Sequence, residues 1–416
     1  MRTTNSLLYC LLLAALAQLP TACEDSLALS STPPPPDAAS DAASNDAASE
    51  DAAQDAGATN AEGGARDSGV VHLVEAGIDE PDACVLGRND PKHCGCAGEQ
   101  CAAGAGCEDG MCREPPREYA WTTHCGPIRL TVDDTNVYWT ERDSGFVRAV
   151  KVGGGPVMDI AQLQINPAHI VSDAEGVYWV ARGDFASEHT WIRKLALPLA
   201  PSTPREMVNE WNSYGPIMSL AVHGGSLYYG WLHQVRRVDM DDPDLTRVTV
   251  ARMADGQGFA EGLIIEDARG IWQDSDGRLV TGTLDPSDPT NLTDIGRVPT
   301  SLRDEIAYDA DWLYWIKATT VQRSKLDGTR YEAEHVVTHP NQESITGLAM
   351  DDTHIYFASS QGLILKHSRE PAAQSEPLSA YPVIAREQPA ARSLAVRDGR
   401  LYWATEDCAI RSASVE

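Results

Sequence analysis

The chain has 416 residues, enough for two or three domains, and a formal net charge of −28 at pH 7. This excess of acidic residues argues against a nucleic-acid partner, because anionic phosphates would be repelled. The composition changes along the chain, and we take its predicted segments in order.

Residues 1–22 predict an export signal: Arg2, an apolar run from Leu7 to Leu19, then Thr21-Ala22. The run is shorter than the roughly 20 apolar residues that a membrane-spanning helix needs. Leu19-Pro-Thr-Ala-Cys23 resembles the bacterial lipoprotein signal. That resemblance implies lipidation at Cys23 and a place on the outer membrane or cell surface. The alternative is an ordinary cleaved signal and a periplasmic or secreted protein.

Residues 23–83 contain four consecutive prolines and Asp-Ala-Ala-Ser repeats, and from Glu24 to Ala83 there are 14 acidic residues against one basic residue, Arg66. Such a segment has too few apolar side chains to offset the entropy lost on ordering. We therefore predict a disordered, extended linker.

Residues 84–116 predict a small module held by disulfides, because an even set of cysteines lies among glycines with little apolar sequence. Its cysteines are Cys84, Cys94, Cys96, Cys101, Cys107 and Cys112. Their pairing cannot be deduced from spacing. A metal site at His93, Cys94 and Cys96 is the alternative, disfavoured because exported thiolates oxidise.

Residues 117–416 contain a repeat centred on an aromatic residue that follows an aliphatic one. The aligned aromatics are Tyr138, Tyr178, Tyr228, Trp272, Tyr314, Tyr356 and Tyr402, spaced 40 to 50 residues apart. This period is typical of propeller blades or solenoid arrays.

Each unit reads as an apolar strand, a tight turn and an aromatic strand, which predicts a hairpin. Five units place an aspartate five residues before the aromatic, and we interpret these aspartates as turn residues: Asp133, Asp173, Asp267, Asp309 and Asp351. Val137 and Trp139 must cover one face of their strand and Tyr138 the other, so both faces are buried. We predict an all-β, seven-bladed β-propeller, with six or eight blades as alternatives.

The chain ends soon after the third strand of the last unit, so that blade lacks an outer strand. Arg117 to Thr123, just before the first unit, is placed to supply it and close the ring. Cys125 follows this strand, and Cys408 begins the strand beside it. We predict a disulfide between these two cysteines.

Tyr138-Trp-Thr-Glu141 resembles the YWTD repeat of lipoprotein-receptor-type propellers, and Tyr314 to Arg330 resembles its later part. The fourth position is never aspartate here, and we count seven units instead of that family's usual six. The resemblance implies a propeller that binds proteins and performs no chemistry.

Nine residues before each aligned aromatic, the innermost strand should leave a loop at the mouth of the central channel. The polar residues at this position are the ligand-binding candidates: Arg129, His169, Ser219, Glu305 and Ser393. Loops after the aromatic strands, which carry Glu141, His189 and Trp231, should open on the same face. Arg129, His169 and Glu305 together resemble the ligand or metal cluster of lactonase-like propellers.

The chain contains no serine-hydrolase elbow, zinc-protease motif, phosphate loop or dinucleotide fingerprint. We predict no catalytic residue, metal or cofactor, and interpret the protein as a non-enzymatic binder of an extracellular protein or glycan. The alternative is a metal-dependent hydrolase or lactonase with its site at the channel mouth.

Overall fold

A computed structural model of the chain describes residues 91, 94, 100–101, 105–108, 111–121, 129–183, 189–199, 203–211, 217–254, 260–274, 276–297, 306–326, 333–371, 381–388 and 390–415. The predicted signal, the linker and Cys23, Cys84, Cys96 and Cys125 lie outside these residues. The described part of the chain is all β, and none of it forms a helix that could cross a membrane.

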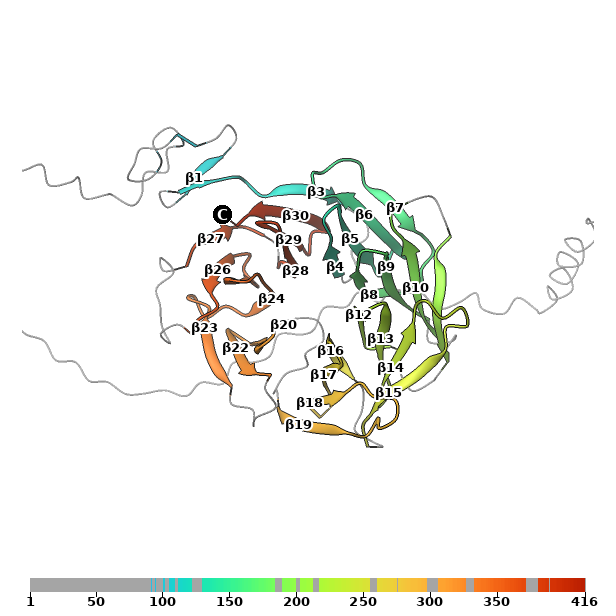
Figure 1. Ribbon diagram of the computed structural model, residues 1–416. Coiled ribbons are helices and arrows are strands. Elements are labelled where there is room, and N and C mark those ends of the chain that lie inside the picture. The colour runs from blue at the N-terminus through green and yellow to red at the C-terminus, as the bar shows by residue number, and fades with distance from the viewer. Residues whose placement is uncertain are drawn as a thin grey trace, which may run out of the picture. The chain divides into compact units, whose positions relative to one another are not determined.

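Seven antiparallel sheets of four strands form a ring, so the prediction of a seven-bladed propeller is confirmed. Figure 1 shows β4, β8, β12, β16, β20, β24 and β28 as the innermost strands of their blades. Each of the first six blades consists of four strands that follow one another in the sequence.

The first four blades contain, in chain order, β4 (Arg129–Val132), β5 (Asn136–Glu141), β6 (Phe146–Lys151), β7 (Met158–Ala161); β8 (Pro167–Ser172), β9 (Gly176–Arg182), β10 (His189–Ala196), β11 (Arg205–Trp211); β12 (Ser219–His223), β13 (Ser226–Trp231), β14 (Gln234–Asp239), β15 (Arg247–Arg252); and β16 (Glu261–Glu266), β17 (Arg269–Gln273), β18 (Arg278–Thr283), β19 (Leu292–Arg297). The last three contain β20 (Ile306–Tyr308), β21 (Trp312–Lys317), β22 (Thr320–Lys325), β23 (Glu334–Thr338); β24 (Ile345–Met350), β25 (His354–Ser359), β26 (Ile364–Ser368), β27 (Val383–Ala385); and β28 (Arg392–Arg397), β29 (Arg400–Ala404), β30 (Ala409–Ser414), β3 (Arg117–Trp121).

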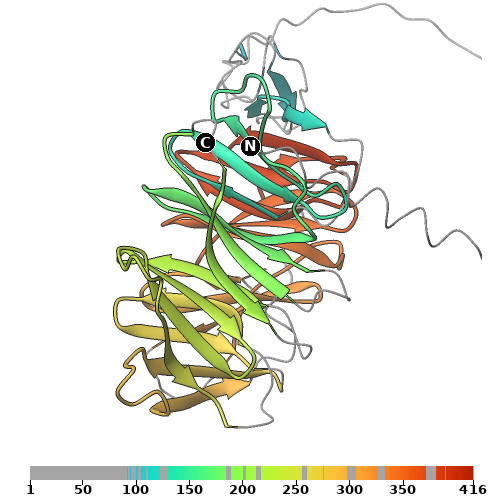
Figure 2. The same ribbon diagram turned by 90° about the vertical axis from the view of Figure 1, so that its right-hand side faces the viewer.

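The seventh blade joins the two ends of the ring, as the sequence predicts. Its outer strand is β3, which pairs with β30 and lies beside it in Figure 2. Tyr119 also donates its hydroxyl to the carbonyl of Val152 in the first blade at 2.8 Å. Cys408 is disulfide-bonded. Its predicted partner, Cys125, lies outside the described residues, so that pairing stays a prediction.

The prediction that disulfides hold the segment before the propeller is confirmed by two of them, Cys94–Cys107 and Cys101–Cys112. Each disulfide is attached to a short hairpin of β1 (Gly106–Glu108) and β2 (Met111–Arg113), in which Cys107 lies opposite Cys112. Because the sulfur of Cys94 is bonded to another cysteine, it is not a thiolate that can bind a metal.

The aromatic strands are buried on both faces because each blade lies between two neighbours. Val137, Tyr138 and Trp139 are fully buried. Tyr138 packs with Val177 of the second blade, whereas Val137 and Trp139 pack with Tyr402 of the seventh. Seven apolar clusters of this kind fill the seven blade junctions.

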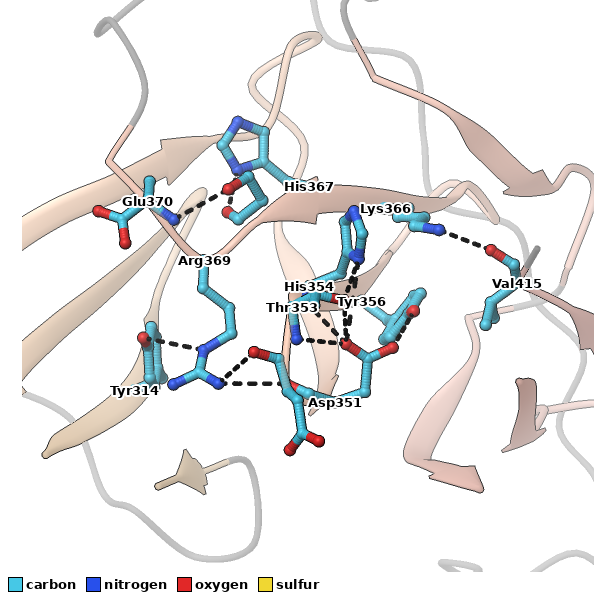
Figure 3. A network of polar contacts seen from close by, with 12 residues as sticks. Tyr314, Asp351, Thr353, His354, Tyr356, Lys366, His367, Arg369, Glu370 and Val415 are labelled. Atoms are coloured by element: carbon cyan, nitrogen blue, oxygen red, sulfur yellow. Dashed lines mark hydrogen bonds and ion pairs between the residues drawn. The ribbon is translucent and has the colours of Figure 1, made fainter. Parts of the chain in front are cut away.

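Four of the five repeated aspartates hold the turns that start the aromatic strands, whereas the side chain of the fifth, Asp267, is 97% exposed. Figure 3 shows Asp351, which accepts the backbone N–H groups of Thr353 and His354, each at 2.8 Å, and the hydroxyl of Tyr356 at 2.5 Å. Burial acts to raise the pKa of Asp351, but these hydrogen bonds outweigh it and the pKa is lowered. Asp133 makes the same contacts with Thr135, Asn136 and Tyr138.

Candidate binding site on the second blade

Ser219 and Ser393, two of the predicted channel-mouth residues, hold neighbouring blades together. The buried Ser219 hydroxyl donates to the carbonyl of Ala260 at 2.8 Å, which joins the third blade to the start of the fourth. The Ser393 hydroxyl accepts the N–H of Leu130 at 3.0 Å, which joins the seventh blade to the first. Their predicted ligand role remains a prediction.

Of the other three channel-mouth candidates, the structure describes Arg129 and His169. Arg129 is half-buried at the start of β4. His169 on β8 places Nε2 3.1 Å from a guanidinium nitrogen of Arg182. Glu305 lies outside the described residues, so the predicted cluster of Arg129, His169 and Glu305 stays a prediction.

A different feature sets the second blade apart: its outer hairpin is longer than its counterparts. In β10 and β11 the pairing shifts at a bulge after Ile192, and three further pairs lie on the channel-mouth side of Ile192. The third and fifth blades have the same bulge, after Val235 and Val321, but only one further pair each. The second blade therefore carries an extension that the propeller itself does not require.

One face of this extension is aromatic. His189 lies opposite Trp211 and Trp191 lies opposite Asn209, so these four side chains share a face, which we call the aromatic platform. The rings of His189 and Trp191 are stacked, with centroids 5.5 Å apart and planes 11° apart. His189 Nδ1 donates to Asn209 Oδ1 at 2.8 Å. Trp211 is 66% exposed.

The opposite face of the extension is clamped to the third blade. Glu210, the neighbour of Trp211, is buried and accepts the hydroxyl of Tyr229 at 2.6 Å and a guanidinium N–H of Arg236 at 2.7 Å. Burial raises the pKa of Tyr229, and the negative charge of Glu210 raises it further. Because Glu210 is fixed in this way, the strand that presents Trp211 is held rigidly.

A turn between the first and second blades places two more apolar side chains near the platform. Leu163 is 92% exposed and Ile165 is 42% exposed, and we call this pair the apolar turn. Gln164, between them, points inward and accepts N–H groups from Trp179 at 3.1 Å and Arg193 at 2.7 Å. The guanidinium of Arg193 lies 5.8 Å from the Trp191 ring, which connects the turn to the platform.

The same turn elsewhere in the ring shows that its exposed apolar residues are not needed for folding. Leu163 has a φ of 56°, and it is followed by the buried Gln164. Before the seventh blade, Glu387 has a φ of 56° and is followed by Gln388, which accepts the N–H of Trp403 at 3.3 Å. There the exposed residue is charged. The turn therefore does not require the exposed leucine at the equivalent position.

Sequence reasoning found only part of this site. It placed His189 on the functional face, and it correctly interpreted the aromatic residues of the second strands, such as Trp139 and Trp179, as core, but it assigned no role to Trp211. It also expected Glu141 in an open loop, whereas Glu141 is buried and accepts the indole N–H of Trp139 at 2.9 Å. The signal for Trp211 is its place at the end of an outer strand, in Arg205-Glu-Met-Val-Asn-Glu-Trp211.

A hollow lies on the opposite face, at the turns between the first and second blades. It has a volume of about 1100 Å³ and is lined in part by Asp133, Asp173, Met158, Leu197 and Arg397. Asp133 and Asp173 hold their own turns by hydrogen bonds, so these two carboxylates already have structural roles.

No protein-family model matches the chain, and no curated protein matches it in sequence. Among solved structures, it is similar to a catalytically inactive virginiamycin B lyase from Staphylococcus aureus with quinupristin, at 12% identity and a TM-score of 0.54, over 72% of this chain and 99% of that one. It is similar to the WD40 propeller domain of Doa1, at 13% identity and a TM-score of 0.52, over 72% and 97%. It also resembles the computationally designed Ika8 protein, at 13% identity and a TM-score of 0.50, over 72% and 99%. At such identities the likeness shows the fold alone, a β-propeller.

Proposed function

We propose that the propeller is a non-catalytic recognition module that binds its ligand through the aromatic platform and the apolar turn of the second blade. The observation that carries this proposal is Trp211, 66% exposed on a strand extension that the buried Glu210 fixes to the next blade. The propeller fold is consistent with a binding role. The aromatic platform and the apolar turn, which we call together the second-blade patch, are the exposed surface that we propose contacts the ligand.

The physical case rests on exposed apolar surface and rigidity. Five large apolar side chains are exposed among the described residues, and Leu163, Ile165 and Trp211 of this patch are three of them. Exposing them to water is unfavourable, and covering them with a ligand recovers that free energy. Tryptophan is also enriched among residues that dominate binding energy. Because the platform is already ordered, little conformational entropy is lost on binding.

We further propose that the module acts outside the cytoplasm, at a bacterial cell surface. The export signal and Cys23 support a lipid anchor, and the acidic linker of residues 23–83 would give the propeller reach from that anchor. The ligand would then be a component of the cell surface or of its surroundings.

The test is a binding titration of the full mature chain against intact cells of the bacterium that produces it. We expect Trp211→Ala to weaken binding by about tenfold, the effect of losing roughly 1.4 kcal/mol. Tyr308→Ala is the matched control, because Tyr308 is an aromatic residue 45% exposed on the fifth blade. Equal binding by both variants and the wild type would refute the proposal, provided that thermal melts show all three to be folded.

A further inference from the structure

We infer that the ligand of the second-blade patch is a saccharide, and that the aromatic platform binds it by ring stacking. This inference rests on the proposed function and deepens it. A pyranose ring has an apolar C–H face and an edge of hydroxyls that both donate and accept hydrogen bonds. The platform offers a matching partner for each of these features.

The stacking surface is the exposed side chain of Trp211. Aromatic rings attract C–H groups through the negative charge of the π face. Trp211 is directly opposite His189, whose ring is stacked on Trp191, so ring surfaces follow one another on both strands of the hairpin. Opposed residues on antiparallel strands lie about 5 Å apart, which places these rings within the length of one or two sugar units.

The polar partners lie between these rings. Asn209 Oδ1 can only accept, so His189 Nδ1 carries the proton of their bond, and in the uncharged tautomer with that proton Nε2 is an acceptor. The amide Nδ2 of Asn209 supplies two N–H donors beside it. Within the described part of the chain, no hydrogen bond is formed by His189 Nε2 or Asn209 Nδ2. A donor and an acceptor side by side next to a ring match adjacent sugar hydroxyls.

The charges around the platform favour a saccharide over the alternative, a protein partner docked by ionic contacts. Glu210 is turned to the other face and neutralised by Arg236 at 2.7 Å, while Arg193 is bonded to Gln164. Arg247 donates to the backbone carbonyl of Asn209 at 2.7 Å. Within the described residues, Glu210, Arg193 and Arg247 therefore each have a partner in the protein, and the four side chains of the platform itself are rings and an amide.

The test treats the cell surface before the titration. One portion of cells is oxidised with periodate, which cleaves the carbon–carbon bond between vicinal hydroxyls of sugars as iodate is formed, and a second portion is digested with proteinase K. After washing, each is titrated with the full mature chain. We expect binding to be lost after periodate and kept after proteinase K. Binding that survives periodate overturns the inference, and its loss after proteinase K alone would identify a protein partner.

Two variants separate stacking from simple apolar contact. Trp211→Phe keeps a π face and should keep affinity within about threefold, whereas Trp211→Leu keeps apolar bulk without a ring and should lose about tenfold. Equal affinity of the two variants would overturn the saccharide inference. The proposed function fails separately, if Trp211→Ala binds untreated cells as well as the wild type does.

Discussion

Replacing Glu210 with alanine should both destabilise the propeller and weaken binding at the patch. The carboxylate is buried and accepts the hydroxyl of Tyr229 at 2.6 Å and the guanidinium of Arg236 at 2.7 Å. Its removal leaves a buried hydroxyl and a partly buried cation without their acceptor. Breaking a buried ion pair from one side typically costs about 3–5 kcal/mol.

In a protein of this size, where 1 kcal/mol shifts the melting temperature by about 2 °C, a loss of that magnitude lowers it by roughly 6–10 °C. The assay is thermal unfolding followed by circular dichroism, with cell binding measured below the transition. Glu206→Ala is the control, because Glu206 is an exposed glutamate on the same strand. Glu210→Gln, which keeps an acceptor oxygen, should fall between the two.

Melting of Glu210→Ala within about 2 °C of Glu206→Ala would refute the reasoning, because the clamp would then contribute less than about 1 kcal/mol. Unchanged cell binding would refute the claim that the clamp positions Trp211. The two readouts are independent, so each part of the account can fail separately.

Four further predictions concern the fold. The lowered pKa of Asp351 stabilises the folded state above its unfolded value of 3.8, so the advantage of wild type over Asp351→Asn in free energy of unfolding should shrink as the pH falls below 3.8 in acid-unfolding titrations. Burial raises the pKa of Tyr402 from 10.0 to about 12, so its contribution to stability should be lost as the pH rises through that range, and phenolate absorbance should appear together with unfolding. Non-reducing peptide mapping should recover Cys125 joined to Cys408, and recovery of Cys125 as a free thiol would contradict that pairing. A chain that begins after Trp121 lacks β3, which leaves β30 as an open edge, and light scattering should show aggregation that the full mature chain does not.

The repeat made the fold predictable because every blade must bury both faces of its aromatic strand. Tyr138 and Trp139 are adjacent and both large, which forces burial on both faces of a strand, and only sheets packed on both sides provide that. The aspartates were predictable for a similar reason, since a side chain that holds a tight turn recurs wherever the turn recurs.

The patch was less predictable because it consists of departures from the repeat. Trp211 lies on an extension whose length depends on pairing between β10 and β11, and strand pairing beyond a bulge cannot be read from composition. Leu163 became recognisable only when the turn at Glu387 showed the same backbone conformation with a charged residue. Ser219 and Ser393 form hydrogen bonds to neighbouring blades that the sequence did not indicate, because contacts between blades are not visible in the repeat, and their predicted ligand role stays a prediction.

The most direct test of the account is to measure which aromatic side chains become protected when the protein binds. Hydroxyl-radical oxidation of the wild-type mature chain, with and without intact cells, can be read residue by residue by mass spectrometry. The account predicts that Trp211 is oxidised readily in the free protein and protected on cells, while Tyr308 is oxidised equally in both states. Protection of Tyr308 with continued oxidation of Trp211 would contradict it and place the binding surface elsewhere on the ring.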